Sequence, residues 1–168
     1  AERTFGVMRA KGIESLMIWP EHCVVSTWGH QIAEPLRNAV AEWRKKTGLA
    51  ARYVFKGENP YTDQFSVFEG LDASYPETAF NESFAARLAA FDQVTFAGEA
   101  LSHCVQESIL SYLRGRRNQQ QNNQQQSNQQ QNVRLLVDCT SPVGGFDRDR
   151  SLQLLRDAGV TFVTCVTI

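Results

Sequence analysis

The stretch Val94-Thr-Phe-Ala-Gly-Glu-Ala-Leu-Ser-His-Cys104-Val105 decides the fold. Its first residues are typical of a buried strand, a turn of small residues follows, and Cys104 stands where a helix begins. The helix continues with apolar residues at helical spacing, namely Ile109, Leu110 and Leu113. A strand that leads through a tight turn into a helix is the repeating unit of α/β domains.

Cys104 is a candidate nucleophile because of this position. A helix N-terminus carries unpaired backbone N–H groups and the positive end of the helix dipole, and both favour a thiolate over a thiol. The same N–H groups could hold the oxyanion that forms when a thiolate attacks a carbonyl. The alternative from the residues alone is a free cysteine that packs as a small hydrophobe.

Strands and helices alternate along the rest of the chain. Apolar and β-branched runs predict strands, and helical spacing predicts helices, so the pattern predicts an α/β fold, a three-layer αβα sandwich with a mostly parallel sheet. Lys56 and Cys104 each follow a strand, so both belong at one edge of that sheet. The predicted strands are Ala51–Phe55, Gln93–Ala97, Val133–Cys139 and Val160–Val166, and the predicted helices are Glu2–Lys11, Glu34–Thr47, Glu77–Ala90, His103–Arg114 and Arg148–Asp157.

Three ordered motifs resemble the cysteine hydrolase superfamily of nicotinamidases and isochorismatases. The first is Gly-x-Ala-x-x-x-Cys-Val, at Gly98–Val105, and the second is Trp19-Pro-Glu-His22-Cys. The third is Val54-Phe-Lys56-Gly57, followed by Asn59-Pro-Tyr61 and by Phe65-Ser-Val-Phe68. The resemblance covers nearly the whole chain and implies the isochorismatase-like hydrolase fold.

The resemblance also implies roles for individual residues. Cys104 would be the nucleophile, and Lys56 would lie beside its thiol. The Glu99–Ala100 peptide bond would be cis, so that the N–H groups of Ala100 and Cys104 form the oxyanion hole. His22 matches a metal ligand of nicotinamidases, so a divalent metal such as zinc is a candidate, although the chemistry requires no cofactor.

Several further residues have two interpretations. Trp19, Trp28 and Phe65 are candidate walls of a pocket for a flat substrate, or side chains of the core. His103 could serve as a general base, but a residue next to Cys104 on a helix points away from it, so we expect His103 at the mouth of the site or in solvent. Glu99 has no role that the motif specifies.

Two elements of the family pattern have no match. The family has an Asp on its first strand that works as the acid/base, and an Asp-x-His pair that completes the metal site. We therefore expect residues 1–168 to form a single isochorismatase-like domain that is N-terminally incomplete. The function predicted is a cysteine-dependent hydrolase of a small carboxamide, through a thioester. The alternative is a catalytically impaired domain that serves as a structural or interaction module.

Composition excludes several classes of partner. The 168 residues carry 17 basic and 18 acidic side chains. The sequence contains no basic stripe of the kind that would predict nucleic-acid binding. No apolar run approaches the ~20 residues of a membrane helix. Four cysteines without a Cys-x-x-Cys motif favour reduced thiols and a cytoplasmic location. A small-molecule amide is the expected partner. The sequence is compatible with a homo-oligomer and does not decide the oligomeric state.

Residues 118–132 are all Gln or Asn except Ser127. Such a composition cannot bury apolar surface, so we predict a disordered, solvent-exposed loop inserted between a helix and a strand.

Overall fold

The computed structural model describes residues 2–11, 13, 18–72, 74–122 and 131–166. Contacts divide the chain into two units. The first, here called the sheet unit, comprises residues 1–7 and 55–168, and the second unit comprises residues 8–54. No helix in the described ranges is long and apolar enough to cross a membrane.

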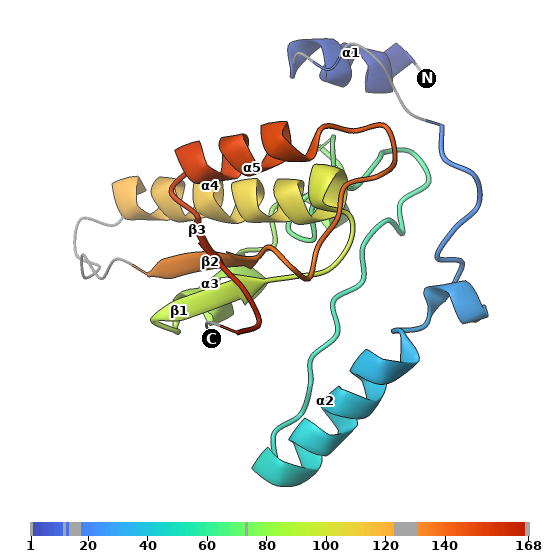
Figure 1. The fold of residues 1–168 in the computed structure, drawn as a ribbon. Coiled ribbons are helices and arrows are strands. Elements are labelled where there is room, and N and C mark those ends of the chain that lie inside the picture. The colour runs from blue at the N-terminus through green and yellow to red at the C-terminus, as the bar shows by residue number, and fades with distance from the viewer. Residues whose placement is uncertain (1, 12, 14–17, 73, 123–130, 167–168) are drawn as a thin grey trace. The chain divides into compact units, whose positions relative to one another are not determined.

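A parallel sheet forms the centre of the sheet unit (Figure 1). Its strands are β1 (Gln93–Phe96), β2 (Asn132–Leu136) and β3 (Thr161–Val163), in the order β1-β2-β3. Val94 pairs with Val133, and Leu135 pairs with Phe162. The predicted α/β class with a parallel sheet is confirmed. Because the strands are parallel, their carboxyl ends all reach the same edge of the sheet.

Helices flank this sheet, and α4 (Gln106–Asn122) and α5 (Arg148–Asp157) lie over one face of it (Figure 1). α3 (Glu82–Ala89) precedes β1 and packs against α4. Capping side chains fix two helix starts: Asn81 accepts from the Phe84 N–H, and Asp147 accepts from the N–H groups of Asp149 and Arg150. The short helices are η2 (Pro76–Thr78), with 3₁₀ geometry, and η3 (Leu101–Val105), with π geometry.

The core lies between the sheet and α4. Every second residue of β2 faces α4, so Val133 and Leu135 are buried with Ile109 and Tyr112. Phe68 is the centre of an aromatic cluster, and its ring stacks on the rings of Phe80, Phe84 and Tyr112. This cluster attaches the segment that follows Lys56 to the helix that follows Cys104.

The predicted strand Ala51–Phe55 does not form. The segment belongs to no ladder, and its side chains are largely exposed, with 62% of Tyr53 and 58% of Phe55 open to solvent. A strand needs a hydrogen-bonded neighbour, and local sequence does not reveal whether one is present. The predicted strand Val160–Val166 shortens to β3 for the same reason, because its last residues leave the ladder.

The Gln/Asn-rich segment 118–132 differs from the predicted loop at both ends. Residues 118–122 continue α4, and Asn132 begins β2. Gln131 is buried: its side-chain oxygen accepts from the Tyr112 hydroxyl at 2.6 Å, and its amide nitrogen donates to the Leu88 carbonyl at 2.7 Å. A buried amide is stable when its polar atoms have partners, and composition alone does not show such partners. Residues 123–130 lie outside the described ranges.

The second unit contains α2 (Glu34–Thr47), whose bounds are those that the sequence predicts. Pro35 stands in its first turn, and Gly48 ends it in the left-handed conformation, with its N–H donating to the Arg44 carbonyl. Before it comes the short 3₁₀ helix η1 (Trp28–His30). α1 (Glu2–Ala10) begins in the sheet unit and ends in the second unit.

Candidate active site

Cys104 lies just beyond the carboxyl end of β1, in the turn that leads into α4. Gly98 has a φ of 112°, a conformation that favours glycine, and the Glu99–Ala100 peptide bond is cis. Two backbone bonds attach this turn to the loop after β2: the Gly98 N–H donates to the Cys139 carbonyl, and the Leu101 N–H donates to the Ser141 carbonyl. These two bonds therefore fix the turn to the loop that follows the neighbouring strand.

Glu99 adds a side-chain anchor to the same turn. Its carboxylate accepts from the Ser141 N–H at 3.1 Å and from the Ser141 hydroxyl at 3.0 Å. The sequence motif assigns this position no role, because the partner stands in a loop 42 residues later. Glu99 thus positions the peptide bond that precedes Ala100.

The turn that carries Cys104 is a π helix, η3, and not the first turn of an α helix. The Ala100 carbonyl accepts from the N–H groups of both His103 and Val105 at 3.1 Å. Leu101 and Val105 are buried, whereas the Cys104 side chain is half-buried. Single π turns occur frequently at functional sites, because they shift side chains off the regular helix face. The thiol is therefore fixed by buried neighbours but stays accessible.

His103 is held between two aromatic rings. Its ring lies edge-on to Phe146, with 4.5 Å between centroids, and tilted against Phe65, at 5.5 Å. One ring nitrogen, Nδ1, is 2.8 Å from the Ser102 hydroxyl. Burial lowers the pKa of His103 below its usual 6.5, and the carboxylates of Asp63 and Glu107 oppose this shift. The histidine is thus half-buried and forms part of an aromatic wall.

Lys56 contacts Gln64, the residue that precedes Phe65 in the chain. Its exposed amine donates to the Gln64 carbonyl at 3.0 Å, and the Gly57 N–H donates to the Gln64 side chain at 2.9 Å. Phe65 comes next in the chain and packs against His103. The structure therefore connects Lys56 to the Cys104 turn through Gln64, Phe65 and His103, and the amine itself is bound to a backbone carbonyl.

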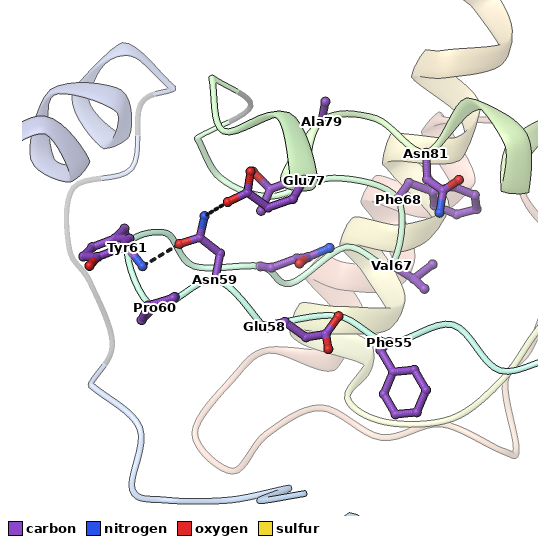
Figure 2. Close-up of a pocket in the computed structure, with 12 residues that line it drawn as sticks. Phe55, Glu58, Asn59, Pro60, Tyr61, Val67, Phe68, Glu77, Ala79 and Asn81 are labelled. Carbon is purple, nitrogen blue, oxygen red and sulfur yellow. Dashed lines mark hydrogen bonds between the residues drawn. The ribbon is translucent and has the colours of Figure 1, made fainter.

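A pocket of about 270 Å³ lies beside this region (Figure 2). Asn59, one of its lining residues, bridges two others: its amide nitrogen donates to Glu77, and its oxygen accepts from the Tyr61 N–H, each at 2.7 Å. Cys104 is not among the residues that line it, so the pocket is adjacent to the candidate site and separate from it. The lining residues are Phe55, Glu58, Asn59, Pro60, Tyr61, Gln64, Val67, Phe68, Glu77, Thr78, Ala79 and Asn81.

Trp19, Trp28 and His22 belong to the second unit. The Trp28 ring is 88% exposed, and Trp19 lies edge-on to His22 at 6.2 Å. The His22 Nδ1 atom is 2.7 Å from the Pro20 carbonyl, which can only accept, so this nitrogen carries the proton. Such a bond leaves Nε2 available to a metal.

A metal site at His22 requires further ligands. Among the described residues, one group of three side chains could hold a metal ion. It consists of Asp138, Cys139 and Cys165. His22 is not in that group. A divalent metal at His22 stays a prediction.

No protein-family model matches the sequence, and no curated protein matches it. Solved structures do match. The yeast nicotinamidase Pnc1p is similar with a TM-score of 0.61 and 20% identity, over 86% of this chain and 57% of that one. A nicotinamidase/pyrazinamidase of Acinetobacter baumanii gives 0.56 and 16%, over 88% and 59%. The pyrazinamidase of Pyrococcus horikoshii, in complex with zinc, gives 0.55 and 20%, over 93% and 66%.

This likeness shows the fold. The chain has the isochorismatase-like α/β fold of the nicotinamidases and pyrazinamidases, as the sequence motifs predicted. It spans between 57% and 66% of the length of these solved chains.

Proposed function

We propose that this chain carries the nucleophile of a small-carboxamide hydrolase of the nicotinamidase type. The observation that supports this most strongly is the position of Cys104: a half-buried thiol in a π turn, beyond the end of β1, next to a cis peptide bond. The likeness of the fold to solved nicotinamidases supports the substrate class.

In the proposed reaction, the Cys104 thiolate attacks the carbonyl carbon of the amide. The resulting oxyanion accepts hydrogen bonds from the N–H groups of Ala100 and Cys104. The nitrogen takes up a proton from water as the C–N bond breaks, so that ammonia leaves and a thioester remains on the sulfur. Water attacks the thioester, which releases the carboxylic acid and the free thiol. The overall change converts one amide and one water into one acid and one ammonia.

Other residues would bind and orient the substrate. Phe65, packed on His103, offers a flat apolar surface beside the Cys104 turn. Lys56 would exchange its bond to the Gln64 carbonyl for the reacting centre, where its charge favours the thiolate.

A second candidate function is a catalytically impaired domain that acts as a structural or interaction module. The bond between the Lys56 amine and the Gln64 carbonyl favours it, because a backbone carbonyl then engages the amine. The two functions differ in one measurable property, the reactivity of Cys104.

The test is alkylation of each cysteine against pH, followed by peptide mass spectrometry, in the wild type and in Lys56→Ala. We expect Cys104 to be alkylated faster than Cys23, an exposed thiol, and to lose this advantage in Lys56→Ala. Nicotinaldehyde, an inhibitor found bound to the yeast enzyme, serves as a second probe, because thiolates add reversibly to aldehydes. Its binding should vanish in Cys104→Ser. An ordinary or inert Cys104 would overturn the hydrolase proposal and leave the interaction module.

A further inference from the structure

A second group of reactive side chains lies at the same edge of the sheet, one strand beyond the Cys104 turn. The Cys139 and Cys165 sulfur atoms are 3.2 Å apart. The Asp138 carboxylate accepts from the Cys165 N–H at 2.9 and 3.1 Å. One ligand atom from each of the three residues lies within 4.8 Å of the others, and all three residues are exposed.

The fold creates this group, because the sequence places its cysteines 26 residues apart. β2 and β3 are parallel neighbours, and the Val137 N–H still donates to the Val163 carbonyl at their ends. Beyond that bond, the Cys139 N–H turns back to the Leu136 carbonyl. Asp138 and Cys139 therefore leave β2 where Cys165 leaves β3.

We propose that Asp138, Cys139 and Cys165 bind a thiophilic divalent cation such as Zn²⁺, with solvent as the fourth ligand. Two sulfurs and one carboxylate oxygen form a set that suits tetrahedral zinc. Sulfurs that share one zinc ion lie about 3.8 Å apart, given Zn–S bonds of about 2.3 Å. The pair needs to open by only about half an ångström to reach that separation, whereas a disulfide, at about 2.05 Å, would need a larger closure.

Without a cation, the surroundings of Cys165 favour its protonated form. The hydrogen bond to Cys139 and the nearby Asp138 carboxylate raise the pKa of the Cys165 thiol to about 11. A bound cation reverses this effect, because it stabilises thiolate and carboxylate together and releases the thiol protons. The bound ion would fasten the short edge strand β3 to β2.

The test uses the reduced full chain with Cys23→Ser and Cys104→Ser, so that only this pair of thiols remains. Titration with Co²⁺ should give a sulfur-to-cobalt charge-transfer band with one ion per chain, and Zn²⁺ should displace it. Cys139→Ser and Cys165→Ser should each abolish the band. Asp138→Asn should weaken affinity by about tenfold or more, while Asp149→Asn, an exposed carboxylate on α5, should leave it unchanged.

Circular dichroism of each variant establishes that it is folded before binding is compared. A band that persists in both cysteine variants would overturn the proposal. So would the absence of any band from the folded, reduced protein, or a Cys139–Cys165 disulfide that forms in air while the reduced chain takes up no cation.

Discussion

A single ring beside Cys104 shows how its surroundings set the chemistry of a residue. His103 lies between Phe65 and Phe146, and this burial lowers its pKa. The sequence placed His103 at the mouth of the site or in solvent, because the spacing of neighbouring residues on a helix shows only direction. Phe146, which covers the ring, follows two glycines in a loop, and no local pattern indicates that contact.

The lowered pKa of His103 gives a pH dependence with a definite sign. Its folded pKa lies below the 6.5 of the free side chain, so unfolding takes up a proton in the window between the two values. Stability should therefore fall as pH drops below about 6.5 toward the folded pKa. We expect the melting temperature of His103→Gln to fall less than that of the wild type between about pH 7.5 and about pH 5.

His22→Gln is the matched control, because it removes an exposed histidine. The difference between the pH profiles of the two variants isolates the contribution of His103. If His103→Gln instead runs parallel to the wild type across the whole range, the half-buried ring does not contribute to the pH dependence.

At the scale of elements, α4 contacts the aromatic cluster through a residue without a side chain. Gly115 is buried, and a Cβ atom added there would overlap the ring of Phe80. Glycine in a helix normally costs stability relative to alanine, so its presence in α4 needs a reason. Here the reason is the close approach of the Phe80 ring.

We expect Gly115→Ala to destabilise the chain by about 1–2 kcal/mol, because overpacking outweighs the gain of up to about 1 kcal/mol in helix propensity. Gly6→Ala, in α1, is the control: nothing lies within 4 Å of its added Cβ, so the same change should be neutral or stabilising. Chemical denaturation measures both. Combining Gly115→Ala with Phe80→Leu should recover part of the loss, and purely additive losses would contradict the steric explanation.

The sequence predicted the elements whose signals are local. Helix α5 has the predicted bounds because Asp147 caps its start, and α2 does because Gly48 ends it. The prediction of a strand at Ala51–Phe55 was wrong, because strand formation depends on a partner outside the segment. The π turn at Cys104 was also not predicted, because the spacing of apolar residues does not distinguish a π turn from an α turn.

At the scale of the whole molecule, the sequence motifs predicted the fold and the edge of the sheet that carries Cys104. They did not predict the contacts that link distant segments. Glu99 with Ser141 and Cys139 with Cys165 each join residues from separate strand ends. Parallel strands bring such residues together only after the intervening helix has crossed over, so neither spacing nor composition reveals the pairs.

Gln131 provides a further link between distant segments. Its side chain accepts from Tyr112 and Arg116 of α4, and donates to the carbonyls of Leu88 in α3 and Phe91 before β1. One buried amide thus joins two helices to the start of the sheet, although it belongs to a tract whose composition predicts only a solvent-exposed loop.

Gln131→Ala should therefore lower the free energy of unfolding by about 1–3 kcal/mol, because it leaves the buried Tyr112 hydroxyl and two carbonyls without this partner. Gln121→Ala, an exposed residue of the same tract on α4, should stay within about 0.5 kcal/mol of the wild type. Urea denaturation distinguishes the two variants. Equal stability would mean that solvent replaces every bond of Gln131 at no cost, and the tract would then contribute to the fold only as a connection between α4 and β2.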